Sequence, residues 1–438
     1  MRSTFLVGLL TVAFSTSAQT MYFPPLVGTA WDTLSPASLG WCQHRIDSLY
    51  DFLEQKNTKG FVVLKDGRIV LERYFGTFTQ DSSWYWASAG KTLTGFLVGM
   101  AQEQGFLDIN DPTSQYLGTG WTTCSPVQEA AITVRHQLTM STGLDDGVQP
   151  DNDCTDPNCL VYLADPGARW AYHNAPYTLL RDVLQSATGL NENLWTYQQV
   201  GSRIGMSGLW LDLGWNNVFF STPRAMARFG HLLLNQGVWA SDTLLHDQAY
   251  FTAMTTTSQP LNESYGYLTW LNGQASFMVP GLQLQIPGSI VPNAPADMFM
   301  ALGKNDQKIH VVPSEGLVVV RMGNSADSTS LVPIVFDNEM WAYINALSCG
   351  LSAGGTEGTA SGTIVYPNPC AAHLTVRLPE AMRGAGVVEC TDALGRIVAT
   401  SSLSGEFTFA TGAWLPGIYS VRITTASGTV VQQRIVKE

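Results

Sequence analysis

The sequence predicts a mixed α+β fold, in which an antiparallel sheet is flanked by helices and carries an all-helical subdomain, followed by a small all-β sandwich. Three observations lead to this prediction. Apolar runs typical of strands lie near both ends of residues 19–348, helical periodicity dominates the middle, and short β-rich runs separated by turns fill residues 362–438. Strands at both ends with helices between them favour an antiparallel sheet over repeated βαβ units.

The N-terminal elements follow from local signals. Residues 1–18 are predicted to be a signal peptide, because Arg2 precedes a short apolar core that ends in small residues. Ser35-Pro36 is a typical helix start and predicts a helix to about Gln55. Asp66-Gly67 between two β-rich runs predicts a hairpin.

The same patterns place the remaining elements. We expect helices over 92–104, 222–234 and 336–347, and strands over 265–271, 299–303, 308–312 and 317–322. Residues 349–361 are rich in Gly, Ser, Thr and Ala and are predicted to be a linker. The expected domains are therefore 19–348 and 362–438.

Composition excludes several partners. Charged residues make up 13% of the chain and the formal net charge is −12, so nucleic acid and an anionic membrane are not expected partners. No run is long enough for a transmembrane helix, and the expected product is a soluble exported protein. Export places the seven cysteines in an oxidising compartment.

The strongest candidate site is Ser88-Ala89-Gly90-Lys91 at the start of the apolar helix 92–104. Three residues apart on a helix, the Ser88 hydroxyl and the Lys91 amine share a face. Lysine can deprotonate a serine only if burial lowers its pKa, and the surrounding apolar residues predict such burial. Gly95 and Gly99 predict close packing on another face of this helix. The competing interpretation is that Ser88 caps a core helix whose Lys91 reaches solvent.

An acidic loop over 145–159 interrupts the helical region. Its aspartates Asp151, Asp153 and Asp156 weakly resemble a calcium loop, but the glycine and glutamate that an EF-hand requires are missing. We expect a solvated loop at the lip of a cleft. The zinc motifs His-Glu-x-x-His and Cys-x-x-Cys are also missing from the sequence, so no metal or cofactor is expected.

The first domain resembles the serine β-lactamase and penicillin-binding-protein superfamily, within it the class C-like esterases and aminohexanoate-oligomer hydrolases. The matching motifs occur in order, and they are 88–91, 108–117, 132–144, Tyr172-His173-Asn174 and 221–230. The resemblance implies that Ser88 is acylated, that Lys91 and Tyr172 share the work of general base, and that Asn174 orients Lys91 or the substrate amide. A tyrosine base would need nearby positive charge, which Lys91 could supply. His173 between the motif residues is not expected to act as a triad base.

The third motif of this superfamily departs from its usual form. In place of Lys-Thr-Gly, or a version beginning with His or Trp, the best match is Ala301-Leu302-Gly303, followed by Lys304. The backbone N–H groups of Ser88 and Lys304 would then form an oxyanion hole. The missing first cation argues against β-lactam and peptidoglycan substrates, and Lys304 either replaces it or is an exposed loop lysine.

The C-terminal module resembles the sorting domain of type IX secretion cargo. The matching residues are Tyr366-Pro367-Asn368-Pro369, then 392–396 and 415–419. The resemblance implies export through the periplasm to the cell surface or medium, with the type IX secretion machinery as a partner. The alternative is a generic or carbohydrate-binding β-sandwich.

The seven cysteines suggest several disulfide pairs, and the sequence does not decide among all of them. The resemblance favours Cys42–Cys349, because the first and last helices pack together in the superfamily. Cys154–Cys159 could close the lip loop, Cys370–Cys390 is possible, and Cys124 is left over unless it competes for Cys154 or Cys159. We expect the cleft to be shaped by the acidic loop, Trp84, Trp86, Trp170 and residues 280–295, without strong affinity for anions.

These observations predict a secreted serine hydrolase that acts on a small-molecule or oligomeric ester or amide. The alternatives are a D,D-peptidase or β-lactamase, and a non-catalytic surface binding protein on a hydrolase fold.

Overall fold

The computed structural model describes residues 21–148, 152–327, 334–349, 364–378, 386–392, 396–402, 405–425 and 430–438. The chain forms two compact units that divide between Ser348 and Cys349. The predicted signal peptide and residues 350–361 of the predicted linker lie outside the described residues.

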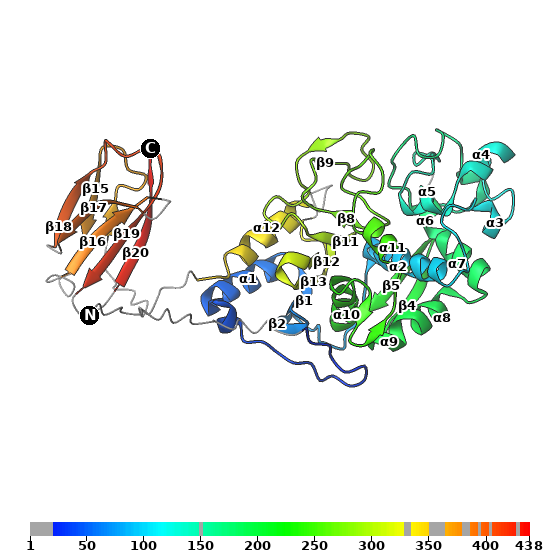
Figure 1. Ribbon diagram of the computed structural model, residues 1–438, viewed down its shortest axis with the longest axis horizontal. Coiled ribbons are helices and arrows are strands. Elements are labelled where there is room, and N and C mark those ends of the chain that lie inside the picture. The colour runs from blue at the N-terminus through cyan, green and yellow to red at the C-terminus, as the bar shows by residue number, and fades with distance from the viewer. Residues whose placement is uncertain are drawn as a thin grey trace, which may run out of the picture. The chain divides into compact units, whose positions relative to one another are not determined.

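The first unit is built around a six-stranded sheet with the order β2-β1-β13-β12-β11-β8 (Figure 1). All its neighbouring strands are antiparallel, as predicted, and β1 from the start of the unit pairs with β13 from its end. The predicted hairpin between β1 and β2 turns at Asp66 and Gly67, which have φ angles of 48° and 82°. In chain order the strands are β1 (Thr58–Lys65), β2 (Arg68–Tyr74), β8 (Trp270–Leu271), β11 (Phe299–Gly303), β12 (Gln307–Val312) and β13 (Leu317–Gly323).

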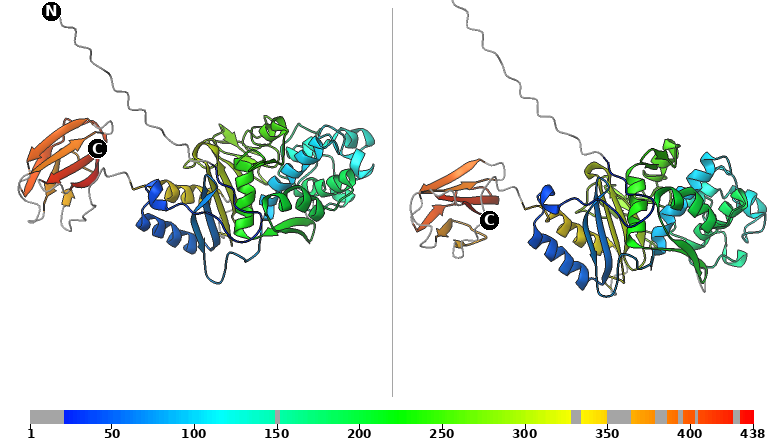
Figure 2. Two further views of the ribbon diagram at one scale, coloured as in Figure 1. Left: turned by 60° about the horizontal axis from the view of Figure 1, so that its bottom comes forward. Right: turned by 90° about the horizontal axis from the view of Figure 1, so that it is seen from below.

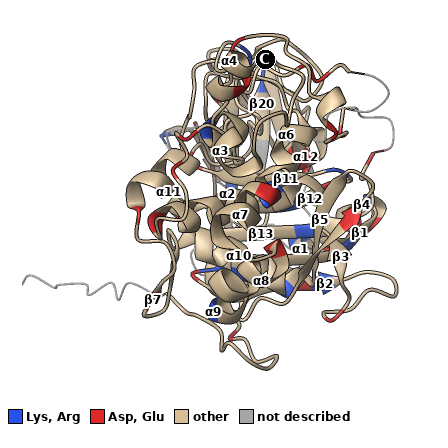
Figure 3. Cartoon of the chain, turned by 90° about the vertical axis from the view of Figure 1, so that its right-hand side faces the viewer, with Lys and Arg blue, Asp and Glu red and all other residues tan. Residues whose placement is uncertain are grey.

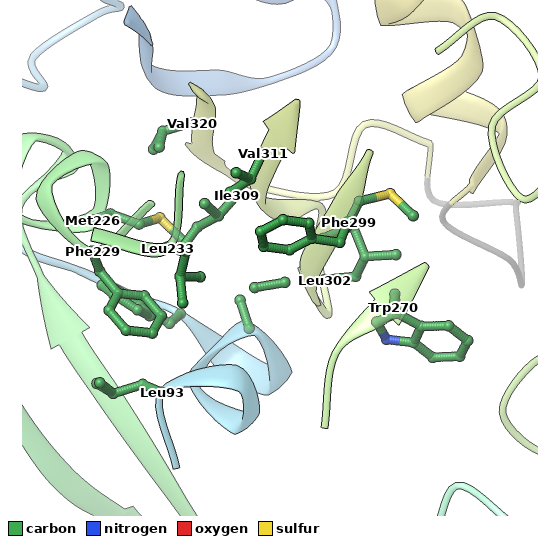
Figure 4. Packing of buried hydrophobic residues seen from close by; sticks show 14 of the residues in the cluster. Leu93, Met226, Phe229, Leu233, Trp270, Phe299, Leu302, Ile309, Val311 and Val320 are labelled. Carbon is green, nitrogen blue, oxygen red and sulfur yellow. The ribbon is translucent and has the colours of Figure 1, made fainter. Parts of the chain in front are cut away.

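Helices cover both faces of this sheet (Figure 2). On one face α1 (Gln43–Gln55) packs beside α12 (Ile334–Asn345), where the rings of Phe52 and Phe336 stack at 5.8 Å. On the other face lie α2 (Gly90–Glu103) and α10 (Pro223–Leu234). Figure 4 shows Met226 and Leu233 of α10 beside Ile309 of β12, whereas the Phe229 ring lies on the side of Leu93 of α2.

Helix α2 packs closely against neighbouring elements. A methyl group on Gly99 would lie 2.3 Å from the Tyr250 ring of α11 (Gln248–Met254), so only glycine permits this approach. Tyr250 Oη in turn donates a hydrogen bond to the Gly95 carbonyl at 2.7 Å. The predicted close packing at Gly95 and Gly99 is confirmed, and it holds α2 rigidly in the core.

The middle of the unit is helical, as predicted, and carries short elements besides. Its helices are α3 (Ser114–Leu117), α4 (Pro126–Ala131), α5 (Val134–Leu138), α6 (Asn174–Thr178), α7 (Leu180–Thr188), α8 (Glu192–Thr196), η4 (Tyr197–Gly201) and α9 (Ser202–Ile204). A small sheet not expected from the sequence joins β3 (Trp84–Tyr85), β5 (Asn216–Ser221) and β4 (Leu209–Leu213) in the order β3-β5-β4. The short elements that remain are η1 (Pro36–Leu39), η2 (Ala87–Ala89), η3 (Pro157–Cys159), β6 (Val238–Trp239), β7 (Asp242–Thr243), β9 (Ser276–Phe277), β10 (Ile286–Pro287) and η5 (Pro313–Glu315).

Two expected elements have different bounds. The helix predicted from Ser35 breaks at Gly40, whose φ of 71° ends η1 before α1 starts. The strand predicted over 265–271 is confined to β8, because the Gly266 N–H donates to the Thr269 carbonyl at 2.8 Å and closes a turn there. Both differences reflect turn geometry that hydrophobic periodicity does not report.

The second unit is an all-β sandwich of two antiparallel sheets, β14-β15-β18 and β17-β16-β19-β20. Its apolar core includes Leu374, Val388, Val421 and Ile435. Its strands are β14 (Ile364–Tyr366), β15 (His373–Arg377), β16 (Gly386–Thr391), β17 (Ile397–Ser402), β18 (Glu406–Ala410), β19 (Gly417–Thr425) and β20 (Val430–Lys437).

The cysteines resolve the predicted alternatives. Cys42 pairs with Cys349, and Cys154 pairs with Cys159 at an S–S distance of 2.12 Å. Cys124 is free, as expected. The suggested Cys370–Cys390 pair is wrong, because both are free thiols buried in the sandwich core.

Charges are sparse over the chain, and most of it is uncharged in the view of Figure 3. Among the helices of the described ranges, not one has the length and apolarity to cross a membrane.

Candidate active site

The predicted nucleophile sits on a tight turn between a strand and a helix. Ser88 lies in η2, and α2 begins two residues later. The preceding Ala87 has a φ of 48°, a left-handed conformation that costs a non-glycine residue about 1 kcal/mol. The turn is anchored by Trp86, whose backbone N–H donates to the Phe219 carbonyl and whose indole N–H donates to Ser221 Oγ, both at 2.7 Å. This anchoring holds Ser88 at the surface of the cavity described below.

Lys91 lies against the serine, as the helical spacing predicts. Its Nζ donates to Ser88 Oγ at 3.3 Å, and the residue is 3% exposed. Burial lowers the Lys91 pKa to about 7, and the negative charge of Asp153 opposes this shift. The amine also lies 3.8 Å from the centre of the Tyr177 ring. A substantial fraction of Lys91 is therefore neutral near pH 7 and able to accept the serine proton.

Tyr172 approaches the same serine from the loop before α6. Its ring stacks on Trp270 of β8, with centroids 5.7 Å apart and planes 22° apart. Burial raises the Tyr172 pKa above its ordinary value, and the hydrogen bond with Ser88 offsets this only in part. The structure therefore differs from the expectation of a tyrosine base with a lowered pKa. The physical reason is that Tyr172 is buried, and burial disfavours the charged tyrosinate.

Asn174, the last residue of the Tyr-x-Asn motif, is the first residue of α6. Its Nδ2 donates to Asp153 Oδ1 at 2.6 Å, and the other oxygen of Asp153 accepts from Asn216 Nδ2 at 2.7 Å. Asp153 belongs to the acidic loop that was expected to be solvated. That expectation is wrong for Asp153, because the amide side chains of Asn174 and Asn216 hold its carboxylate at the candidate site.

The third motif, Gly303-Lys304, runs past the nucleophile turn. A methyl group on Gly303 would lie 2.3 Å from the Trp86 carbonyl oxygen and 3.0 Å from the Ala89 nitrogen, so glycine is required for this close approach. The Lys304 side chain is exposed and lines the cavity. Strand β11 thus ends beside η2, where the oxyanion hole was predicted.

A cluster of buried charged residues packs beneath the turn after β11 and supports it. Arg321 of β13 donates to the carbonyls of Asn305 and Asp306 at 2.9 and 3.0 Å. Lys308 Nζ lies 2.8 Å from Asp337 Oδ2 and 3.4 Å from Asp306 Oδ1, all at side chains with little or no exposure. Burial would raise the Asp337 pKa, but the charges and hydrogen bonds of Lys308 and His310 together outweigh it and hold that pKa below its ordinary value. The cluster fixes the turn that follows Gly303.

All six predicted site residues except Lys91 line one cavity of about 530 Å³. Its walls are largely apolar, and Trp270, Phe277, Ile290, Leu302 and Phe336 are among the residues that form them. Residues 280, 281 and 290 of the predicted cleft segment contribute, and so does Asn152 of the acidic loop. The expectation for the tryptophans is wrong. Trp86 and Trp170 are 0% and 1% exposed core residues, Trp84 does not line the cavity, and Trp270 provides the aromatic wall.

His173 does not take part in the site, as predicted. It is 3% exposed and does not line the cavity, and burial lowers its pKa to about 4. Among the described residues, Cys42, His44 and Cys349 lie close enough together to be considered as metal ligands. The two cysteines form a disulfide with each other, so their sulfur atoms are not available to a metal. The possible calcium ligand Asp151 lies outside the described residues.

Asp153 is the functional residue that sequence reasoning missed. One sequence signal could have pointed to Asp153, namely its position directly before Cys154. A disulfide within a loop indicates that the loop backbone holds one conformation, so the residue beside it can be held at a site. Asn216 was missed as well, because nothing local connects it with the lip loop.

Both units of the chain match known protein families. The family model described as Beta-lactamase matches residues 51–338, and the model described as Secretion system C-terminal sorting domain matches residues 364–438. An uncharacterized protein of Alkalihalophilus pseudofirmus is 25% identical over 305 residues, which are 61% of this chain and 83% of that protein.

Solved structures share the fold. A candidate 6-aminohexanoate-dimer hydrolase from Bacillus anthracis has a TM-score of 0.55 and 18% identity, covering 75% of this chain and 91% of the other. A candidate beta-lactamase from Bacteroides dorei has a TM-score of 0.56 and 15% identity, with coverages of 70% and 99%. A penicillin-binding protein homologue from Caulobacter crescentus has a TM-score of 0.52 and 14% identity, with coverages of 70% and 98%.

Proposed function

Because this chain belongs to the β-lactamase family of serine hydrolases, we propose that it cleaves an ester or amide through an acyl-enzyme on Ser88. The observation that carries the proposal is the buried amine of Lys91, 3.3 Å from the Ser88 hydroxyl, with a pKa lowered to about 7 by burial. A serine beside such an amine can be deprotonated near neutrality, which an exposed lysine could not achieve.

The reaction begins when neutral Lys91 accepts the Ser88 Oγ proton as Oγ bonds to the substrate carbonyl carbon. The carbonyl oxygen becomes an oxyanion facing the backbone N–H groups of Ser88 and Lys304, each contributing roughly 3 kcal/mol to the transition state. The proton on Lys91 then passes to the leaving group as its bond to carbon breaks. In the second half, Lys91 accepts a proton from water as the water oxygen bonds to the acyl carbon. The bond between that carbon and Ser88 Oγ then breaks, Lys91 returns the proton to Oγ, and the acid is released.

Tyr172 serves as a neutral phenol in this scheme. Its raised pKa keeps the proton on the ring oxygen at neutral pH. Its contact with Ser88 places it where it can give this proton to the leaving group and take the proton of Lys91 in exchange, so that the transfer from Lys91 runs through Tyr172. We therefore assign the base to Lys91 and the relay to Tyr172. Asn174, which is hydrogen-bonded to Asp153, is the remaining polar residue of the proposed site.

A D,D-peptidase or β-lactamase activity is the alternative. Lys304, exposed at the cavity, favours it to the extent that this side chain can bind a substrate carboxylate. Fluorescent penicillin tests this alternative, since a stable label on Ser88 would support a cell-wall substrate. The predominantly apolar cavity favours a neutral ester or amide.

The chain is a secreted or cell-surface protein that carries a type IX sorting domain at residues 364–438. Its partner in export is therefore the secretion machinery that reads this domain.

The central test is the initial rate on a short-chain p-nitrophenyl ester, measured for the mature protein and for Ser88→Ala. We expect the variant to lose at least about a thousandfold in kcat/KM, as expected for removal of a nucleophile. The melting temperature of both proteins is the control for folding. Equal rates in the two proteins would contradict the acyl-enzyme mechanism, and so would the absence of any rate on both the ester and the matching p-nitroanilide.

A further inference from the structure

The carboxylate of Asp153 sets the orientation of the Asn174 side-chain amide. Asp153 Oδ1 accepts from Asn174 Nδ2 at 2.6 Å, and an ionised carboxylate has only acceptors to offer. The amide therefore cannot flip without placing two oxygens face to face, which fixes its nitrogen toward Asp153.

This arrangement leaves the carbonyl of Asn174 unused. Within the described ranges, Asn174 Oδ1 is buried and accepts no hydrogen bond. The residue lines the cavity together with Ser88 and Tyr172. A buried acceptor without a donor is costly, so the site is incomplete until a donor arrives.

We propose that Asp153 is a positioning residue that directs Asn174 Oδ1 at the N–H of a scissile secondary amide, so that the site selects amides over esters. This inference rests on the proposed function and narrows its substrate class. An ester places an oxygen where the amide has its N–H, and that oxygen would face Asn174 Oδ1 as a second acceptor. A site built to bind an N–H discriminates strongly against an analogue that lacks it.

The surroundings of Asp153 keep the carboxylate in place. Asn216 Nδ2 on β5 holds the second oxygen at 2.7 Å, and the Cys154–Cys159 disulfide closes the loop on the other side. Asn216 of β5, distant in sequence, thus holds the same carboxylate that contacts Asn174.

The test compares three substrates with the same acyl group: a p-nitroanilide, its N-methyl derivative, which has no N–H, and the p-nitrophenyl ester. kcat/KM is measured for the wild type and for Asp153→Asn near pH 9, above the titration of Lys91, so that the lost charge does not alter the fraction of neutral lysine. Asn at 153 can donate as well as accept, so it no longer fixes the Asn174 amide. We expect Asp153→Asn to lower kcat/KM for the anilide about tenfold more than for the ester or the N-methyl anilide, as for the loss of one hydrogen bond.

Asp156→Asn is the matched control. It removes the same charge from the same loop at an exposed side chain that accepts from Asn158. We expect it to leave the ratio of anilide to ester rates unchanged.

An equal loss on all three substrates in Asp153→Asn would overturn the inference and leave Asp153 a structural role. So would a wild type that cleaves the ester but not the anilide. If Ser88→Ala retained the ester activity, the proposed function itself would fail, and this outcome is distinct from the other two.

Discussion

A lysine buried next to a serine is costly for the folded protein and useful for its chemistry. Lys91 is 3% exposed, and burial lowers its pKa from 10.5 to about 7. The neighbouring rings of Tyr172 and Tyr177, 5.3 and 3.8 Å from Nζ, attract its charged form but do not hydrate it. The residue therefore destabilises the fold at the pH at which it becomes a competent base.

Because burial of Lys91 costs stability while it supports catalysis, we expect Lys91→Met to be inactive but more stable than the wild type near pH 7. Between pH 7 and 10.5 the unfolded chain binds a proton that the folded chain has released, so wild-type stability rises with pH across this window. We expect a gain of about 2–4 kcal/mol for the variant near pH 7, shrinking toward pH 10. Chemical denaturation at both pH values measures it. A gain that is independent of pH would show that lysine titration is not its cause.

At the scale of elements, the site is formed where three segments meet: η2, the end of β11 and the lip loop. Close approach between the first two depends on the missing side chain at Gly303, whose Cβ position is 2.3 Å from the Trp86 carbonyl oxygen. The third segment is held by the Cys154–Cys159 disulfide and by Asn216.

We expect Gly303→Ala to lower kcat/KM by about a hundredfold or more, because β11 must move away from Ser88 and displace an oxyanion-hole donor. The cost in stability should be only about 1–3 kcal/mol, as for other overpacked sites. Kinetics and thermal melting of the same sample separate the two effects. Normal kinetics with a lowered melting temperature would place the oxyanion hole elsewhere.

The two disulfides predict opposite phenotypes. The double variant Cys154→Ser/Cys159→Ser frees the loop that carries Asp153, and we expect a loss of anilide hydrolysis with little change in melting temperature, because the loop that it closes is short. Cys42→Ser/Cys349→Ser opens a far longer loop, so we expect a loss of about 2–4 kcal/mol in stability with unchanged initial rates at 25 °C. The same phenotype in both double variants would contradict these separate roles.

At the scale of the whole molecule, the hydrolase and the sorting domain are separate compact units. The six residues predicted for the site all belong to the first unit, which has its own core. The sorting domain also has its own core, and it serves export.

A protein that ends after Cys349 is therefore expected to keep kcat/KM on p-nitrophenyl esters within about twofold of the full-length mature chain, since burial within a unit determines its stability. Keeping Cys349 retains its disulfide with Cys42. The rate and the melting temperature of both forms measure the effect. A large loss of activity would show that the second unit contributes to the site.

The sequence by itself determined the fold class, the hairpin at Asp66-Gly67, the pairing of Ser88 with Lys91 and the sorting module. These features rest on local periodicity, on turn chemistry and on motifs whose spacing places residues on one face of a helix. Tertiary structure alone decided the rest. It brought Asp153 and Asn216 to Asn174, buried Trp86 and Trp170 in the core, left Cys370 and Cys390 as free thiols, and raised the Tyr172 pKa. Each of these outcomes depends on which distant side chains exclude water from a group, and desolvation is a property of the packed molecule that no local pattern encodes.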